Sequence, residues 1–222
     1  MSFSIQDFLE YFPLLLGGVK IALYVTAVSM ILALIQGLLL ALARLSSVGI
    51  LRKLSAVWVE IIRGTPCLLQ IYYVYYVAPA IGIVLTPITA GIVGLSANYG
   101  AYMSEIFRAS ILSIGAGQLE AGQSLGMSRS LIMRRIVIPQ AVRKIVPPLG
   151  NYLVLMVKDT SLLSTITIRE IMMVAYELSA ITFKFLELFT FAGIIYLGMS
   201  YPLSMFVDWV ERKLDVSRLT EK

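Results

Sequence analysis

The chain contains long stretches without a charged side chain. Between Tyr11 and Ala43 the only charge is Lys20, and between Arg63 and Glu105 there is none. A helix needs about 20 consecutive, mostly apolar residues to cross the hydrocarbon core of a bilayer, so the second stretch has room for two. The 222 residues are 59% hydrophobic and 14% charged, which is more apolar than a soluble domain of this size can bury. We therefore predict an integral membrane protein.

Charge-free runs and turn residues together predict five membrane-spanning helices. Pro79, Gly82 and Pro87 divide the longest run into two spans. The fourth span is long enough only if it continues past Lys158 and Asp159. The predicted spans cover residues 13–43, 64–79, 87–112, 147–166 and 188–208. The expected fold is all-α, with residues 1–222 forming one transmembrane domain.

Basic residues are distributed unevenly between the two ends of these spans. Fourteen lie in the segment after the first span, the segment between the third and fourth spans, and the tail, which includes Arg218 and Lys222. Only Arg169 and Lys184 lie at the other ends, together with an acidic N-terminal stretch. Cytoplasmic loops carry the excess of Lys and Arg in membrane proteins. We therefore expect the N-terminus outside and the C-terminus in the cytoplasm.

Missing residue types exclude several kinds of chemistry. The chain has no histidine, so it lacks Ser–His catalysis and histidine-ligated metal sites. Its one cysteine, Cys67, has no partner in the chain for a disulfide. No G-x-x-x-x-G-K-[ST] phosphate loop is present. We predict that the chain is not an enzyme, has no catalytic or metal-binding residues, binds no cofactor itself and has no nucleic-acid partner.

The longest predicted cytoplasmic connection, residues 113–146, has helical patterns of its own. A short helix is expected between Glu120 and Gly126. Ser128 is a suitable N-cap for a second, amphipathic helix that runs to about Val137, and Pro139 is expected to end or kink it. From periodicity and charge alone, this loop also fits an interfacial helix whose arginines bind lipid phosphates.

The spacing of residues in this loop resembles the EAA loop of ABC importer permeases. That family has EAA, three residues, Gly, nine residues, Ile, one residue and Leu-Pro. The order here is Glu120-Ala121-Gly122, three residues, Gly126, nine residues, Ile136, one residue and Ile138-Pro139. Gly122 in place of alanine and Ile138 in place of leucine are the departures, and glycine slightly weakens a short helix.

Three further segments are similar to the branch of this family that takes up polar amino acids. They are Glu60–Pro66, Ala101–Arg108 and Lys158–Leu162. The resemblance implies a type I ABC importer permease in the cytoplasmic (inner) membrane of a prokaryote, surrounded by the lipid bilayer. It also implies a dimer with a second copy or a paralogue, ATPase subunits that bind ATP and magnesium, an extracytoplasmic substrate-binding protein and a polar amino acid as substrate.

The resemblance assigns coupling to the ATPase to the loop. In this interpretation the short helix inserts into a groove on the ATPase, and Gly126 allows a tight turn between the two loop helices. The coupling residues are Glu120, Ala121, Gly122, Gly126, Ile136 and Pro139.

Polar residues inside the predicted spans are candidates for the substrate path. Charged residues at membrane depth usually face a cavity or a partner, and Lys158 and Asp159 could attract the carboxylate and the ammonium of an amino acid. They could instead form a structural ion pair with another span or reach the interface. The path candidates are Lys158, Asp159, Thr160, Ser161, Asn98 and Tyr102.

Other interpretations remain open at this point. Glu105 and Arg108 have the spacing of an intrahelical ion pair, which favours a structural role, with gating as the second interpretation. The chain could also be a small transporter driven by an ion gradient, a channel subunit or an anchor subunit. The sequence does not name the amino acid and does not distinguish a homodimer from a heterodimer.

Overall fold

The structure is a computed structural model that describes residues 5–214, and it is mostly helical, as predicted. The ends of the predicted domain 1–222, including Arg218 and Lys222, lie outside the described residues. The helices are α1 (Ile5–Arg44), α2 (Gly49–Arg63), α3 (Cys67–Tyr72), α4 (Pro87–Leu112), α5 (Ala116–Ser124), α6 (Arg129–Ile132), α7 (Ile138–Asp159), α8 (Ile171–Thr182) and α9 (Phe185–Leu214).

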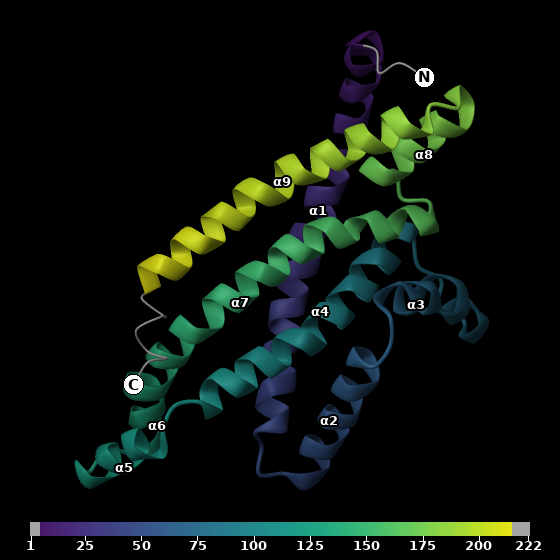
Figure 1. Cartoon of the computed structure of the whole chain (residues 1–222). Coiled ribbons are helices and arrows are strands. Elements are labelled where there is room, and N and C mark those ends of the chain that lie inside the picture. Colours follow the sequence, from purple (N-terminus) through teal and green to yellow (C-terminus); the bar gives the residue numbers. More distant parts are fainter. Residues whose placement is uncertain (1–4, 215–222) are drawn as a thin grey trace.

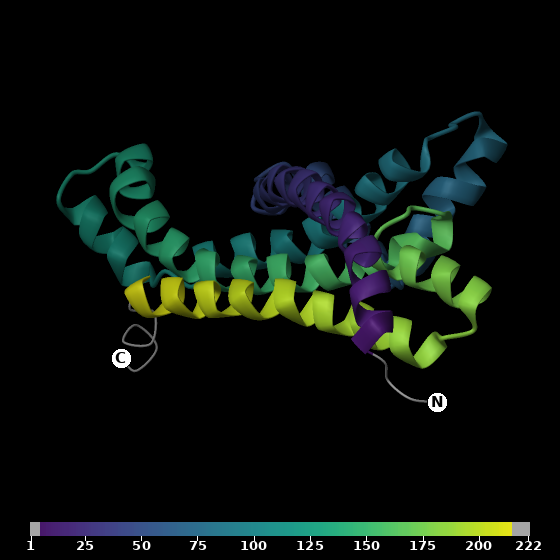
Figure 2. The ribbon, with the colours of Figure 1, turned by 90° about the horizontal axis from the view of Figure 1, so that it is seen from above.

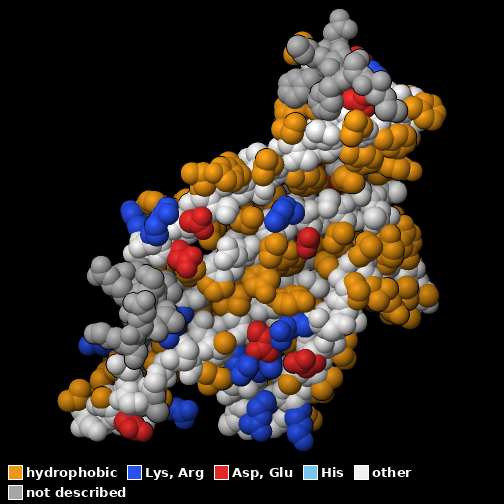
Figure 3. Space-filling model, in the orientation of Figure 1, with side chains coloured by type: hydrophobic (Ala, Val, Ile, Leu, Met, Phe, Trp, Pro, Cys, Tyr) orange, Lys and Arg blue, Asp and Glu red, His pale blue; other side chains and the backbone are white. Residues whose placement is uncertain are grey.

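Three long helices form the main layer of the molecule. Helices α4, α7 and α9 lie side by side, and α1 crosses behind them (Figure 1). Seen from above, α5 and α6 project at one end of this layer, and α8 lies at the other end (Figure 2). Basic side chains on the face in Figure 3 gather mostly toward the end that carries α5 and α6. This grouping agrees with the predicted sidedness, while the orientation in the membrane stays a prediction.

The helices are more numerous than the five predicted spans. The stretch predicted as the third span, 87–112, is one helix, α4, which starts at Pro87 after the Thr86 N-cap. The stretch 64–79 is not one continuous helix, because α3 is followed by a π-helical turn at Tyr73–Val77 and a 3-10 turn at Ala78–Ile81. Helices α2 and α8 lie in segments that were predicted as connections.

Two helices are long and apolar enough on their own to cross a membrane. By length and composition these are Leu9–Arg44, with a mean hydropathy of 2.3, and Phe185–Leu214, with 1.4. Gly49–Arg63 and Cys67–Ile81 would make a third span if taken together, although they are bent by 106°. Helices α4 and α7 do not meet this criterion, so the count of five spans is not confirmed. Much of α4 is buried by protein and carries small polar residues there, which lowers its hydropathy.

Glycines bring α1 and α4 into close contact. A Cβ at Gly37 of α1 would lie 2.9 Å from the carbonyl oxygen of Gly100 on α4. A Cβ at Gly100 would lie 2.8 Å from Oε1 of Gln36. Small residues let helix backbones approach closely, which is the main source of packing between helices in lipid. The largest core cluster follows this contact and includes Ala33 and Met103.

A second contact joins α1 to α8 and α9. Glu170, completely buried, caps α8 by accepting a hydrogen bond from the backbone N–H of Met173 at 2.9 Å, and it also accepts one from the hydroxyl of Tyr196 on α9. A Cβ at Gly18 of α1 would lie 2.5 Å from the backbone nitrogen of Ile171. The start of α8 is therefore held by α1 on one side and by α9 on the other.

Of the two effects predicted for Pro139, an end of the second loop helix or a kink in it, the end is absent. The chain stays helical from α6 through a π-helical turn at Met133–Val137 into α7, where Pro139 lies in the first turn. Proline has no backbone N–H to donate, so one hydrogen bond of the helix is missing there. The wider π turn just before Pro139 lets the helix continue despite this missing bond. The predicted fourth span, 147–166, is accordingly the second half of α7 followed by a 3-10 segment, Thr160–Ile166.

Gly18 and Gly17 are adjacent on α1 and provide a matched test of this packing. We expect Gly18→Ala to lower the free energy of unfolding by about 1–3 kcal/mol, because the added methyl group meets backbone atoms that cannot move aside. We expect Gly17→Ala to be neutral or slightly stabilising, since nothing lies within 4 Å of its Cβ. Thermal unfolding of the two variants in detergent, followed by circular dichroism, measures the difference; equal behaviour would contradict the packing described.

Candidate functional site

Asp159 forms a hydrogen bond that the sequence did not predict. The hydroxyl of Tyr99 on α4 donates to Oδ2 of Asp159 at the end of α7, at 2.7 Å. Tyr99 is only 3% exposed, so this bond holds the carboxylate against α4. The neighbouring Lys158 is exposed and makes no salt bridge within residues 5–214. The two adjacent charges therefore lie in different surroundings.

Thr160 and Ser161 differ in how far their hydroxyls are available. Thr160 is completely buried, and its hydroxyl donates to the carbonyl of Val157 at 2.7 Å. Ser161 is half-buried at the start of the 3-10 segment. Of these two path candidates, only Ser161, two residues after Asp159, is partly exposed.

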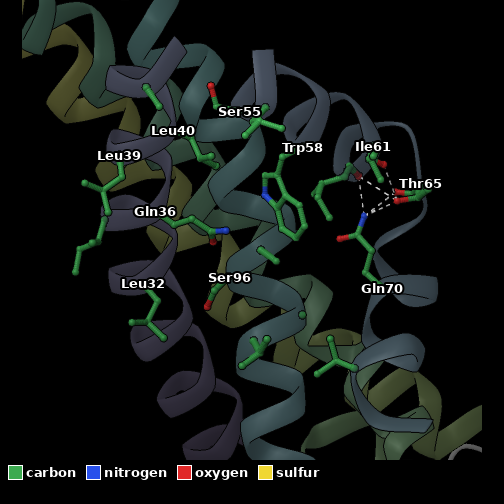
Figure 4. Close-up of a pocket in the computed structure, with 18 of the residues that line it drawn as sticks. Leu32, Gln36, Leu39, Leu40, Ser55, Trp58, Ile61, Thr65, Gln70 and Ser96 are labelled. Carbon is green, nitrogen blue, oxygen red and sulfur yellow. Dashed lines mark hydrogen bonds between the residues drawn. The ribbon is translucent and has the colours of Figure 1, made fainter. Parts of the chain in front are cut away.

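Asn98 belongs to a different polar group from Asp159. Its Nδ2 donates to Oε1 of Gln70 at 3.1 Å, and Nε2 of Gln70 donates to the carbonyl of Ile62 at 2.7 Å and to Oγ1 of Thr65 at 2.9 Å. Figure 4 shows Gln70 reaching back to the turn between α2 and α3. Asn98 therefore ties α4 to this bend, a role that sequence reasoning missed because Gln70 looked like one polar residue in an apolar run.

A groove beside this bend is lined mostly by apolar side chains. It has a volume of about 1480 Å³ and lies between α1, α2, α3 and α4, with Leu39, Trp58 and Ile61 among its walls (Figure 4). Two polar side chains in its wall donate to backbone carbonyls of their own helices: Ser55 donates to Leu51, and Ser96 donates to Ile92. The groove therefore offers little to a zwitterionic ligand.

Tyr102 lies one turn beyond Tyr99 on α4, and its surroundings are aromatic and basic. Its ring centroid is 5.9 Å from that of Tyr152 on α7, and Tyr152 in turn is 5.8 Å from Tyr99. The guanidinium of Arg63 lies over the Tyr102 ring, 5.4 Å from its centroid. Tyr99 and Tyr152 could have been found from the sequence only with the register of α4 against α7.

Glu105 forms a larger ion-pair cluster than the predicted pair with Arg108. Arg108 donates from Nε and from a terminal nitrogen to one carboxylate oxygen, at 3.0 and 2.9 Å. Arg44, at the end of α1, hydrogen-bonds to the other oxygen, and Arg63 of α2 lies 3.5 Å from that same oxygen. One carboxylate thus joins α1, α2 and α4, which supports the structural interpretation of this pair.

The loop residues form a compact helix–turn–helix unit. Gly126 has φ of 73° and follows α5, where Met127 N–H donates to the carbonyl of Gly122 at 3.0 Å. This is a glycine C-cap, in which the left-handed conformation favours glycine. The Ser128 hydroxyl accepts from the N–H of Leu131 at 3.3 Å, which confirms the predicted N-cap.

Gly122, the departure from the family pattern, lies where α5 packs on α6. A Cβ there would lie 2.9 Å from Cγ1 of Ile132 and 3.4 Å from Cδ1 of Ile136. A glycine therefore lets the two loop helices approach, and Ile136 serves this contact. Glu120, Ala121 and Pro139 are exposed on the outside of the unit and available to another chain.

Known proteins resemble this chain over nearly its whole length. A family model described as a binding-protein-dependent transport system inner membrane component matches residues 13–216. The L-cystine transport system permease protein of Bacillus subtilis is 40% identical over 207 residues, which cover 93% of this chain and 88% of that protein. The glutamine transport system permease protein of Escherichia coli (strain K12) is 35% identical over 206 residues, covering 92% and 94%.

A solved structure also matches. The crystal structure of an amino acid ABC transporter with histidines contains a chain that is 31% identical and has a TM-score of 0.91. The match covers 96% of the present chain and 100% of that chain. The two chains therefore share one fold over nearly their whole length.

Replacement of Glu105 tests its joining role. We expect Glu105→Gln to lower the free energy of unfolding by about 2 kcal/mol, because it leaves three guanidiniums around a neutral side chain that is only 20% exposed. The control is Glu177→Gln, which removes the exposed pair with Arg169 and should cost less than about 1 kcal/mol. Chemical unfolding in mixed micelles compares the two; a smaller effect at Glu105 would refute the role.

Proposed function

The chain belongs to the family of binding-protein-dependent transport system inner membrane components, and from this we propose that it is the permease subunit of an ATP-driven importer of polar amino acids. The observation that carries the proposal is the match over nearly the full length to amino-acid permeases, in sequence and in fold. An ion-gradient-driven transporter or a channel subunit is not favoured by these relatives.

The loop unit is the surface that would couple the chain to its ATPase. It projects at one end of the molecule (Figure 2). Glu120 on α5 is exposed. The sequence holds no nucleotide phosphate loop, so ATP and magnesium would bind to separate ATPase subunits. Closure of those subunits would push α5. The continuous helical stretch of α6, the π turn and α7 would carry the movement to the middle of the permease.

The uneven distribution of basic residues supports a position for the substrate-binding protein. With the basic end in the cytoplasm of a prokaryotic inner membrane, α8 and the start of α1 lie at the extracytoplasmic end, where a substrate-binding protein would dock. A second copy or a paralogue would complete the path. We also propose that the chain crosses the membrane five times, with its N-terminus outside.

Asp159 is the residue that we assign to the ammonium group of the amino acid. It is fixed by Tyr99 and lies beside the half-buried Ser161. Lys158 is exposed on another side of the helix and would meet the carboxylate only if the second permease chain or the path brings it there. Thr160 and Asn98 support the backbone and the α2–α3 bend around the path.

Reconstitution tests the function directly. The chain is co-expressed with its ATPase and binding protein, and the complex is placed in proteoliposomes with ATP inside. We expect ATP-dependent uptake of radiolabelled L-cystine, L-glutamine or L-arginine that does not respond to collapse of ion gradients. Uptake that requires an ion gradient and no ATPase subunit would refute the proposal.

Gly126 tests the coupling role of the loop. We expect Gly126→Val to reduce uptake at least about tenfold while the ATPase continues to hydrolyse ATP, because a β-branched residue cannot hold φ of 73° without strain and the loop turn shifts. Gly115→Ala is the control, with an ordinary φ of −58° and nothing within 4 Å of its Cβ. Normal uptake by Gly126→Val would contradict coupling through this turn.

Asp159 and Lys158 test the substrate assignment. We expect Asp159→Asn, which keeps a group that can accept the Tyr99 bond, to lower uptake about tenfold or more through loss of the attraction for ammonium. We expect Lys158→Gln to have a smaller effect, since Lys158 is exposed and unpaired within the described chain. Equal uptake by Asp159→Asn and the unchanged protein would make Asp159 a structural residue.

A further inference from the structure

A continuous column of aromatic rings connects Asp159 to the Glu105 cluster. Tyr99 bonds to Asp159, Tyr152 contacts the rings of both Tyr99 and Tyr102, and Arg63 lies over Tyr102. From Tyr99 to Glu105 the column advances about 9 Å along α4, toward the end that carries the loop unit. It therefore joins an acidic group near the middle of the molecule to a basic cluster nearer the proposed cytoplasmic side.

The basic cluster has more positive charge than its carboxylate can neutralise. Arg44, Arg63 and Arg108 surround Glu105, so three positive charges face one negative charge. Arg44 and Arg108 hydrogen-bond to the carboxylate, whereas Arg63 lies 3.5 Å from it without a hydrogen bond. Its side chain is also the most exposed of the three, at 35% against 12% for Arg44 and 33% for Arg108.

We infer that Arg63 binds the carboxylate of the transported amino acid on its way to the cytoplasm, as the second charged contact after Asp159. The inference rests on the proposed function and extends it to substrates with a free α-carboxylate. A guanidinium presents a planar pair of donors that matches a carboxylate. Because Arg63 has no hydrogen bond to Glu105, offering this pair gives up only the 3.5 Å ion pair of α2 and leaves the bonds between α1 and α4 in place.

The column between the two charges explains why substrate would not be trapped. Tyr102 and Tyr152 are half-buried, so part of each ring faces the surface, while Tyr99 is buried and only positions Asp159. An aromatic face attracts an ammonium group more weakly than a carboxylate does. A path needs sites strong enough to admit a substrate and weak enough to release it. The Tyr102 ring also holds Arg63, with its hydroxyl 3.4 Å from the Arg63 carbonyl.

The test compares an amino acid with its carboxamide. The probe is whichever of L-cystine, L-glutamine and L-arginine the unchanged protein takes up fastest. Proteoliposomes that contain the whole complex are given this probe in radiolabelled form on the outside. Unlabelled competitor is loaded inside, on the cytoplasmic side. We expect the internal free amino acid to inhibit uptake by the unchanged protein at least about tenfold more strongly than its α-carboxamide does. Inhibition from inside reports on the cytoplasmic end of the path and not on the binding protein.

Three variants separate binding from structure. Arg63→Gln should lower uptake and bring the acid-to-carboxamide inhibition ratio near one, and Arg63→Lys should keep part of that ratio. Arg108→Gln removes a charge from the same cluster and should leave the ratio unchanged. A ratio that stays high in Arg63→Gln, or that falls equally in Arg108→Gln, overturns the assignment. If Arg63→Gln does not assemble, the Arg63→Lys ratio decides, since an unchanged ratio there also overturns it. Absence of ATP-dependent uptake by the unchanged protein would instead refute the proposed function.

Discussion

The close contact between α1 and α4 is the constraint on which the rest of the structure depends. Lipid supplies little hydrophobic force between apolar helices, so association relies on packing. Gly37 and Gly100 bring the two backbones together, and the largest core cluster spreads from that contact. With α1 crossing the layer at this point, α7 packs beside α4 and α9 packs beside α7, and α8 is held against the N-terminal half of α1.

Three carboxylates, those of Glu105, Glu170 and Asp159, each bond to a neighbouring helix. Glu105 joins three helices through arginines that would be costly to leave unpaired. Glu170 joins α8 and α9 from a completely buried position. Within residues 5–214, the hydroxyl of Tyr99 is the one hydrogen-bond donor to Asp159, so a carboxylate oxygen stays open to other contacts. The carboxylates of Glu105 and Glu170 have more hydrogen-bond and ion-pair partners than that of Asp159. For this reason we treat Asp159 as a binding residue and the two glutamates as structural residues.

The sequence predicted those features that depend on local chemistry. Pro87 marks the start of α4, Ser128 caps the second loop helix, and the spacing around Gly126 anticipates the turn that the backbone adopts. Features that depend on packing were missed. Helix α2 was taken for a connection because of its charges, although one face, with Val59 and Ile62, is buried.

Long-range pairing was equally hidden. The Tyr99–Asp159 bond joins residues 60 positions apart, and its prediction would require the register of α4 against α7. The predicted helix end at Pro139 is absent for a related reason. A proline rule describes a regular α-helix, and the π-helical turn at Met133–Val137 changes the hydrogen-bond pattern that the rule assumes.

The bend between α2 and α3 would be easy to regard as a hinge, because it contains Gly64 and Pro66. Its open carbonyl groups, however, are occupied: Gln70 donates to Ile62 and Thr65, and Asn98 anchors Gln70 to α4. In a lipid environment a straightened or flexed bend would leave these polar groups without partners. The bend is therefore rigid. Under the proposed coupling, α2, α3 and α4 would move together as one rigid body when the ATPase displaces the loop unit.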